Sequence, residues 1–322
     1  MLVTGAGGFI GGHLVERLVR DGARVRGFHR YNSRDDRGTL DWIDPAVLEE
    51  VDVHTGDLRD IESVQRAVRG VEVVFHLGAQ VAVPYSFENP RDFTETNVVG
   101  TLNVARAVLD AGVSRMVHTS TSEVYGTAVV VPIDESHPLQ AQSPYAASKI
   151  GADKVVESFC CTYELPGVIL RPFNTFGPRQ SARAVVPTII TQLLQGPRLK
   201  LGSLEPRRDL TFVHDTVAGF LAAASSDAAV GRTVQLGTGE APSIGEIVEL
   251  VGDLLGVEPE VTTDEARIRP ANSEVGLLLS HPGLAAELLG WRPQVSLRDG
   301  LAQTIEWVAS HQHSYRTGEY VT

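Results

Sequence analysis

The sequence predicts an α/β protein built on a doubly wound parallel sheet, with a smaller α/β lobe toward the carboxy-terminal end. Two observations lead to this fold class. Short apolar runs alternate with helical patterns through the first half of the chain, and the helical patterns end in glycine, the usual left-handed cap. A glycine-rich stretch also joins the first apolar run to the first helical pattern, where such sheets turn from strand to helix.

The expected strands are short and apolar, and helical patterns separate them. The strands cover residues 1–4, 23–28, 71–79, 115–122 and 167–173, and a further strand ends at Asp57. The helical patterns cover residues 11–22, 63–70 and 100–112. Near Arg179 the rhythm changes, because prolines and longer loops appear. We therefore expect a sheet domain over residues 1–178 and a substrate lobe over residues 179–322 whose elements interleave with the sheet.

Composition and charge exclude several classes of partner. The 322 residues carry 28 basic and 40 acidic side chains, a net charge of −12, and an acidic field repels nucleic acids and anionic membranes. No apolar run reaches about 18 residues, so we expect no membrane span. Cys160 and Cys161 are adjacent and have no third cysteine to pair with. This usage, and a start directly in a strand with no signal peptide, predicts a cytoplasmic location.

The stretch TGAGGFIGG places Gly5, Gly8 and Gly11 at the spacing G-x-x-G-x-x-G between a strand and a helix. Glycine permits the tight turn and lets backbone N–H groups approach a pyrophosphate, while the helix N-terminus adds a partial positive charge. An unliganded tight turn gives the same spacing. The position at the first strand–helix junction favours a Rossmann-like dinucleotide site. Asp57, at the end of a later strand, then accepts from the adenine amine.

The end of the second strand bears on the form of the dinucleotide. An NAD enzyme usually carries a ribose-binding acid there, but this sequence has His29 and Arg30, and no carboxylate before Asp35. An arginine at this position can bind the 2′-phosphate of NADP, although a solvated surface arginine gives the same pattern. We therefore expect NAD or NADP as the cofactor, with NADP favoured.

The stretch SPYAASK puts Tyr145 and Lys149 four residues apart on an expected helix, so the two side chains share one face. An ammonium beside a phenol favours the phenolate and lowers its pKa from about 10, which gives a base near neutral pH. After a dinucleotide loop, this pair predicts a catalytic site. His76 and His118, at strand ends, are expected to be core histidines, and no cluster has metal-ligand spacing.

Eight stretches connect the sequence, in chain order, to a known family: TGAGGFIGGHL, GDL, HLGAQ, NVVGTLNV, HTSTSEVYG, SPYAASK, RPFNTFGPRQ and RRDLTFVHD. Together they resemble the extended short-chain dehydrogenase/reductase family and, within it, the nucleotide-sugar epimerase/dehydratase branch. The resemblance covers nearly the whole chain. It implies a tightly bound nicotinamide cofactor, reduced and re-oxidised within each turnover, and a nucleotide-diphosphate-sugar substrate.

The resemblance also implies the site residues. It places the catalytic set at Thr121, Ser122, Glu123, Tyr145 and Lys149. Beside Tyr145 and Lys149, it implies cofactor contacts at Gly5, Gly8, Phe9, Ile10, Gly11, Arg30, Asp57, Leu58, Leu77 and Ala79. It implies substrate contacts, with guanidinium groups that suit phosphate oxygens, at Gln80, Asn174, Arg183, Arg208 and Arg269.

The stretch HTSTSEVYG distinguishes members of the branch. Thr121 matches the family's Ser/Thr that hydrogen-bonds the sugar 4-hydroxyl, and Glu123 occupies a position that is usually uncharged in 4-epimerases. In 4,6-dehydratases a carboxylate there removes the C5 proton once C4 is a ketone. The Ser-Glu pair resembles dehydratases of GDP-mannose and of GDP- or UDP-N-acetylhexosamines rather than those of dTDP sugars. The acid that protonates the C6 leaving group is left open between Glu123 and water held by Ser122.

We therefore expect a nucleotide-sugar 4,6-dehydratase that oxidises C4, eliminates water across C5–C6 and returns hydride to C6, giving a 4-keto-6-deoxy sugar. A UDP-uronate decarboxylase, which shares the Thr-Ser-Glu pattern, and a 4-epimerase are the alternatives. A non-catalytic dinucleotide-binding protein is a remote alternative, since such proteins usually lose the tyrosine or the lysine. Stretches such as QSARAVVPTIITQLL also resemble the legionaminic-type dehydratase subgroup. The resemblance also implies a homodimer, with helical segments 106–110 and 153–159 in a four-helix interface, although an exposed amphipathic helix gives the same pattern.

Overall fold

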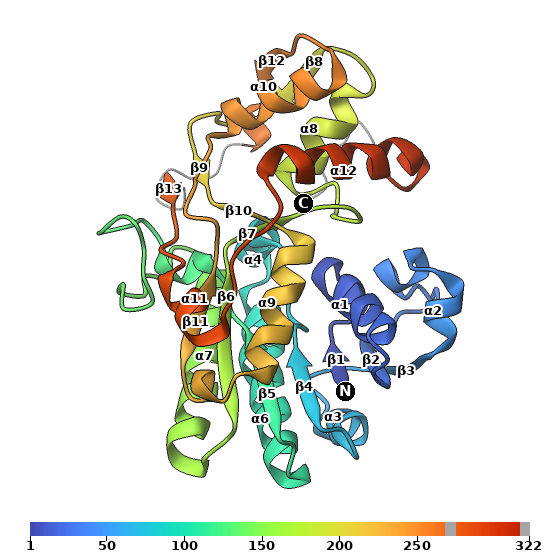
Figure 1. Cartoon of the computed structure of the whole chain (residues 1–322), viewed down its shortest axis with the longest axis vertical. Helices are drawn as coiled ribbons and strands as arrows, with labels where there is room; N and C mark the ends of the chain where they lie inside the picture. Colours follow the sequence, from blue (N-terminus) through green and yellow to red (C-terminus); the bar gives the residue numbers. More distant parts are fainter. Residues whose placement is uncertain (268–274, 316–322) are drawn as a thin grey trace.

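The computed structural model describes residues 1–267 and 275–315 (Figure 1). One parallel sheet of seven strands has the order β11-β6-β5-β4-β1-β2-β3, which confirms the predicted fold class. Its strands are β1 (Leu2–Thr4), β2 (Val25–Arg30), β3 (Val51–Gly56), β4 (Val73–His76), β5 (Arg115–Thr119), β6 (Gly167–Pro172) and β11 (Thr233–Leu236).

Helices cover both faces of this sheet. On one face lie α1 (Phe9–Arg20), α9 (Val213–Ser225) and α11 (Gly283–Leu289), whose core includes Leu14, Phe220 and Ala285. On the other lie α3 (Ile61–Val68), α6 (Gly100–Ala111) and α7 (Pro144–Tyr163). The glycine caps are where the sequence predicts them. Gly112 ends α6 with a φ of 63°, in the left-handed region that glycine adopts without a Cβ clash.

Shorter elements connect the layers on the amino-terminal side. Two helices, η1 (Gly38–Trp42) and α2 (Pro45–Glu49), follow β2. After β4 the chain forms α4 (Val83–Glu88), α5 (Pro90–Phe93) and the π-helical turn η2 (Thr94–Val99), which leads directly into α6. The 3₁₀ turn η3 (Ser122–Tyr125) follows β5. These turns carry the loops that face the carboxyl ends of the strands.

A second lobe lies beyond those carboxyl ends and has its own core (Figure 1). Its helices are α8 (Val185–Leu193), α10 (Ile244–Leu255) and α12 (Leu297–Ser310). Three short parallel pairs complete it: β7 (Asn174–Phe176) with β10 (Leu210–Phe212), β8 (Arg198–Leu201) with β12 (Glu260–Thr263), and β9 (Arg207–Arg208) with β13 (Leu277–Leu278). Because β11, α9 and α11 belong to the sheet layer, the chain crosses between the layers repeatedly after residue 178. The division at residue 178 stays a prediction.

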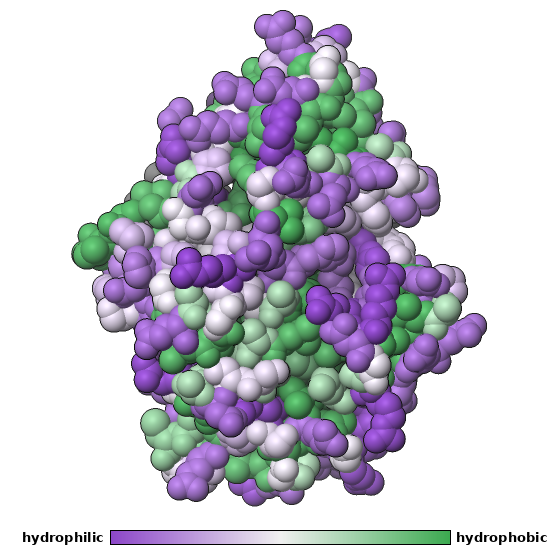
Figure 2. All heavy atoms as spheres, viewed as in Figure 1, coloured by the Kyte–Doolittle hydropathy of each residue, from purple (hydrophilic) through white to green (hydrophobic). Residues whose placement is uncertain are grey.

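The surface is mostly hydrophilic, and hydrophobic side chains gather on a projecting loop between β5 and α7 (Figure 2). That loop exposes three successive valines, at positions 129–131. In the described part of the chain, no helix is both long and apolar enough to cross a membrane. Asp153, which the sequence analysis assigned to an intersubunit helix, is fully buried within the chain. The homodimer itself stays a prediction.

Candidate active site

The sheet order reverses at β1, which pairs with β2 on one side and β4 on the other. In doubly wound sheets, ligands bind at this switch point, outside the carboxyl ends of the strands. A cavity of about 730 Å³ opens there. Sixteen of the predicted site residues line it: Gly5, Gly8, Phe9, Ile10, Gly11, Arg30, Asp57, Leu58, Leu77, Ala79, Gln80, Thr121, Ser122, Glu123, Tyr145 and Asn174.

The glycine loop has the geometry that a pyrophosphate requires. Gly5 has a φ of 71°, and a Cβ on it would lie 2.7 Å from the backbone nitrogen of Gly78, so only glycine fits. The Gly8 N–H donates to the Gly5 carbonyl at 2.9 Å, and α1 begins at Phe9 without a side-chain cap. The first N–H groups of a helix have no intrahelical acceptor. Those of α1 therefore offer donors to an anion in the cavity.

The ends of β2 and β3 form the far wall of this cavity. The His29 ring nitrogen Nε2 lies 3.1 Å from the Thr55 hydroxyl, whereas Arg30 is exposed. Asp57 accepts from Arg59 at 2.9 and 2.6 Å. Its hydrogen bonds with this side chain hold the pKa of Asp57 below its ordinary value. The end of β2 thus presents a cation and no carboxylate.

A loop after β2, residues 31–38, completes that wall, and the sequence analysis did not assign it to the site. Asn32, Arg34, Asp36, Arg37 and Gly38 line the cavity.

The turn after this loop holds the glycine loop directly. The Thr39 N–H donates to the Gly7 carbonyl at 2.9 Å, and its hydroxyl donates to the Gly8 carbonyl at 2.7 Å. Trp42, at the end of the same turn, lies 5.3 Å from the Trp307 ring of α12. The loop's mixture of charged residues and turn formers gives no periodic signal, which is why sequence reasoning missed it.

Tyr145, Thr121 and Glu123 come together in the cavity from two separate parts of the chain. Tyr145 lies in the first turn of α7, which Ser143 caps by accepting from the Ala146 N–H at 3.0 Å. Thr121 caps η3 by accepting from the Glu123 N–H at 3.2 Å. Thr121 lowers the pKa of the Tyr145 phenol, and the charge of Glu123 raises it, so both groups act on that phenol. A proton acceptor, a hydroxyl and a carboxylate thus face one space.

Lys149 lies beneath this group and is 4% exposed. Its ammonium donates to the Thr119 carbonyl at 2.6 Å. Burial lowers the pKa of Lys149 to about 8. The expectation that the Tyr145 phenol has a pKa below its ordinary value is wrong for the chain alone. Burial raises the pKa of the Tyr145 phenol above its ordinary value, Thr121 lowers it, and Glu123 raises it again.

The two histidines near the strand ends are buried, as predicted. His76 Nδ1 lies 2.8 Å from the Thr4 hydroxyl, and its Nε2 lies 3.0 Å from the Thr101 hydroxyl. His118 Nε2 lies 3.2 Å from Asp153. Burial lowers the pKa of both rings, so they are neutral components of the core.

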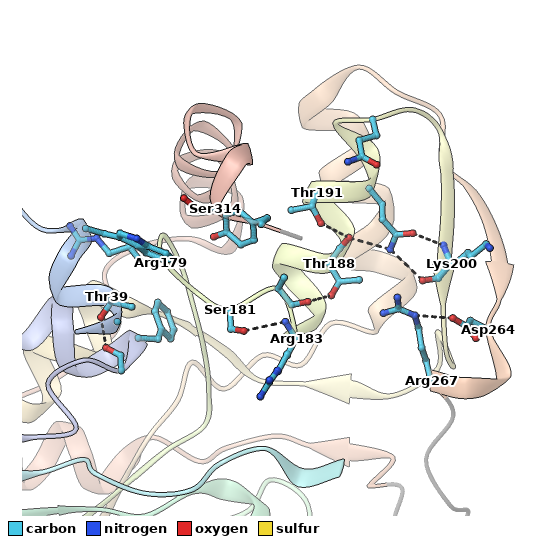
Figure 3. A pocket seen from close by; sticks show the side chains of 18 of the residues that line it. Thr39, Arg179, Ser181, Arg183, Thr188, Thr191, Lys200, Asp264, Arg267 and Ser314 are labelled. Carbon is cyan, nitrogen blue, oxygen red and sulfur yellow. Dashed lines mark hydrogen bonds and ion pairs between the residues drawn. The ribbon is translucent and has the colours of Figure 1, made fainter. Parts of the chain in front are cut away.

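A second cavity, of about 1200 Å³, adjoins the first at Gly7, Gly8 and Phe9. Figure 3 shows Thr39 and Arg179 on one side of it, and Thr188, Thr191, Lys200 and Arg267 on the other. Arg179 pairs with Glu16 of α1 at 2.7 Å. Arg183, a predicted substrate contact, lines this cavity and is exposed.

One predicted arginine contact within the described residues lies apart from these cavities. Arg208 lies in β9, is 7% exposed, and lines neither cavity; its guanidinium donates to the Arg207 carbonyl at 3.0 Å. Its role toward the substrate stays a prediction. Arg269 lies outside the described residues. Sequence reasoning also missed Gly78 and Phe173, which line the first cavity. Each is adjacent to a predicted strand end, and that adjacency was the available signal.

Comparisons with known proteins agree with this geometry. The family model of GDP-mannose 4,6 dehydratase matches residues 2–304. The chain is 34% identical to a UDP-glucose 4-epimerase of Mycolicibacterium smegmatis, over 95% of this chain and 97% of the relative. It is 31% identical to UDP-glucuronic acid decarboxylase 1 of Xenopus tropicalis, over 100% of this chain and 75% of that protein.

A solved structure gives the same picture in three dimensions. The dTDP-glucose 4,6-dehydratase of Streptomyces venezuelae, determined with NAD bound, superposes with a TM-score of 0.85 at 33% identity, and covers 98% of each chain. Relatives with three different reactions therefore share nearly the full length of this chain at similar identity. The chain belongs to the GDP-mannose 4,6-dehydratase family, within the nucleotide-sugar epimerase/dehydratase branch of the extended short-chain dehydrogenases/reductases.

Proposed function

We propose that the protein is a nucleotide-diphosphate-sugar 4,6-dehydratase. One observation carries the proposal: the Glu123 carboxylate lines the same cavity as Tyr145 and Thr121. Oxidation at C4 needs only a proton acceptor beside the hydroxyl. A further carboxylate supplies the second base that elimination across C5–C6 requires. The family model that matches the chain is that of a 4,6-dehydratase.

A nicotinamide dinucleotide fits the first cavity. The glycine loop and the start of α1 would hold its pyrophosphate, and Asp57 and Leu58 at the end of β3 would hold the adenine. The S. venezuelae relative with bound NAD supports a cofactor of this class. Arg30 and Arg34, which are both exposed beside β2 and face no carboxylate at the end of that strand, favour NADP. When bound, the group accepts a hydride and later returns it, and its oxidised form adds positive charge to the cavity.

The chain's own residues then move protons. The Tyr145 phenol oxygen takes the proton of the C4 hydroxyl, which the Thr121 hydroxyl orients. The C4 ketone makes the C5 proton acidic, so that Glu123 removes it. The C6 hydroxyl leaves as water once it is protonated, either by Glu123 itself or by a water held by Ser122, and a proton returns to C5 when C6 receives the hydride. Because burial raises the pKa of Tyr145, the phenol is ionised, and so able to accept the C4 proton, only where positive charge compensates. Lys149 supplies such a charge below about pH 8.

The second cavity would hold the nucleotide end of the substrate. Arg183 and Lys200 line it, and the structure shows no acidic partner for either among residues 1–267 and 275–315. Guanidinium and ammonium groups suit the oxygens of a diphosphate. These local cations let an acidic chain bind an acidic substrate.

The test is a product analysis with a matched variant. The wild-type enzyme is incubated with UDP-, GDP-, CDP- and dTDP-hexoses, and product masses are followed. Loss of one water supports the proposal. Glu123→Gln should stop water loss while C4 oxidation continues, visible as reduced nicotinamide absorbance without product. A Glu123→Gln enzyme with full turnover would show that another group is the base.

A 4-epimerase is the second candidate, because the M. smegmatis relative carries that activity at 34% identity. An epimerase would leave the product mass unchanged while inverting C4. A decarboxylase, the activity of the X. tropicalis relative, would release carbon dioxide from a UDP-uronic acid. With a UDP-uronic acid added to the substrates, the product masses separate dehydration from decarboxylation, and an NMR spectrum of the product separates inversion at C4 from an absence of reaction.

A further inference from the structure

Behind the proposed catalytic pair, α7 carries another ionisable side chain that faces the sheet. Asp153 follows Lys149 by four residues and is fully buried, and residues at this spacing share one face of a helix. Asp153 lines neither of the two cavities described above. A carboxylate without access to water is costly unless both of its oxygens have partners.

Asp153 finds those partners on two central strands. Its Oδ1 lies 3.2 Å from Nε2 of His118 in β5, and its Oδ2 accepts from the Ser120 hydroxyl at 2.7 Å. The Arg171 guanidinium of β6 donates to the same Oδ2 from Nε at 3.2 Å and from Nη2 at 3.0 Å. Arg171 is itself held, because its Nη1 donates to the Tyr125 hydroxyl at 3.2 Å. The carboxylate therefore fixes α7 against β5 and β6.

Lys149 makes a parallel contact one helical turn earlier. Its ammonium donates to the Thr119 carbonyl at 2.6 Å, next to Ser120, which binds Asp153. Two successive turns of α7 thus hydrogen-bond to two successive residues, Thr119 and Ser120, at the end of β5. Thr121 comes directly after them, so these two contacts set where Thr121 lies relative to Tyr145.

Titratable and charged side chains surround Lys149, and they come from α7 and from strands β4, β5 and β6. Burial lowers the pKa of Lys149 to about 8, and the negative charge of Asp153 opposes that change. Burial alone would raise the pKa of Asp153, but His118, Arg171 and Lys149 together hold it below its ordinary value. The titratable and charged groups that face this region are Tyr145 and Asp153 of α7, His76 of β4, His118 of β5 and Arg171 of β6. Among these five groups, Asp153 is the one that carries a carboxylate.

We propose that Asp153 is a positioning residue for Lys149: it clamps α7 to residues 118–120 and supplies the buried negative charge that keeps the lysine ammonium protonated. The inference rests on the role of Lys149 in the proposed function. It assigns the alkaline limit of activity to a side chain that never meets the substrate.

The test follows the Lys149 amine directly and needs no substrate. The chain contains three lysines, Lys149, Lys154 and Lys200, and the last two are exposed. Selective carbon-13 labelling of lysine side chains in the full chain gives three NMR titrations. In Asp153→Asn the midpoint of Lys149 should fall by roughly one pH unit or more, the usual effect of removing a nearby opposite charge. The exposed lysines serve as internal references.

Two further variants separate charge from structure. Asp153→Glu keeps the charge, and its Lys149 midpoint should stay near that of wild type. Asp227→Asn removes an exposed carboxylate, which pairs with the buried Arg115, and should leave the Lys149 midpoint unchanged. A folded Asp153→Asn protein with an unchanged Lys149 midpoint would overturn the proposal. If Asp153→Asn does not fold, the Asp153→Glu variant decides the question. A Lys149 midpoint in Asp153→Glu that has fallen by about one pH unit would overturn the proposal, because this variant keeps the negative charge.

An activity measurement distinguishes this inference from the proposed function. If both hold, the alkaline limb of the kcat profile moves to lower pH in Asp153→Asn, while KM for the nucleotide sugar changes little. A wild-type enzyme inactive on every nucleotide sugar refutes the proposed function but leaves the NMR result intact. Full dehydratase activity with an unchanged Lys149 midpoint in Asp153→Asn refutes the inference and leaves the function standing.

Discussion

The two cavities that meet at the glycine loop are built differently. The smaller one gathers the carboxyl ends of the parallel strands, which share one edge of the sheet by construction. The larger one takes its walls from η1, α8, β8, β12 and the segment after α12, elements that meet only when two lobes pack. In the proposed function, the sheet therefore positions the catalytic groups, whereas packing between the lobes forms the cavity for the substrate nucleotide.

The largest effect is expected from a substitution in the smaller cavity, at the carboxyl ends of the strands. Tyr145→Phe removes the phenol that exchanges the C4 proton, and general acid–base groups contribute about 10²–10⁴-fold. We expect turnover to fall by that range while cofactor binding, measured by calorimetry, is kept. Tyr163→Phe, at an exposed tyrosine of the same helix, is the matched control and should be fully active. A loss shared by both variants would point to damage of α7 instead.

Substitutions in the larger cavity, which forms where the two lobes pack, should change substrate binding rather than turnover. Arg183→Ala removes a cation from the larger cavity, and hydrogen bonds to charged groups are worth about 1.5–3 kcal/mol. KM for the nucleotide sugar should rise roughly 10- to 100-fold with kcat nearly unchanged. Arg91→Ala makes the same charge change at an 86% exposed side chain and should leave KM unaltered. A fall in kcat alone for Arg183→Ala would contradict this division between the cavities.

The smallest effect concerns the choice of dinucleotide. Arg30 is exposed at the end of β2, where its charge suits a 2′-phosphate. Arg30→Ala should weaken NADP binding about tenfold and leave NAD binding unchanged, as read by titration of the ligand-free chain. A wild-type protein that prefers NAD would count against the assignment of Arg30 to the cofactor.

The comparison also shows how far sequence reasoning reaches. Gly5, Asp57 and Leu77 directly follow a strand and Thr121 comes two residues after one, so all four line the first cavity. Their meeting at one edge of the sheet follows from the fold class. Arg183 and Arg208 looked equivalent in sequence, yet the first lines a cavity and the second is buried in β9. Nothing in their local patterns separates them, since burial there depends on how the lobes pack.

The electrostatic prediction failed for a related reason. The spacing of Tyr145 and Lys149 is local, and the structure confirms that both lie on one helix. Burial and the charge of Glu123 raise the pKa of the phenol instead. Both depend on other elements that pack around Tyr145. Spacing therefore identified the pair, while its protonation needed the three-dimensional surroundings. Loop 31–38 escaped notice because it has no period at all.

The contact between Trp42 and Trp307 bears on the intrinsic fluorescence of the molecule. Trp42 ends the turn whose Thr39 holds the glycine loop, and Trp307 belongs to the last helix, with the His311 ring stacked on it at 4.3 Å. The two indoles span the boundary between the lobes. Any separation of those lobes must pull them apart, so intrinsic fluorescence reads the opening of the molecule without an added dye.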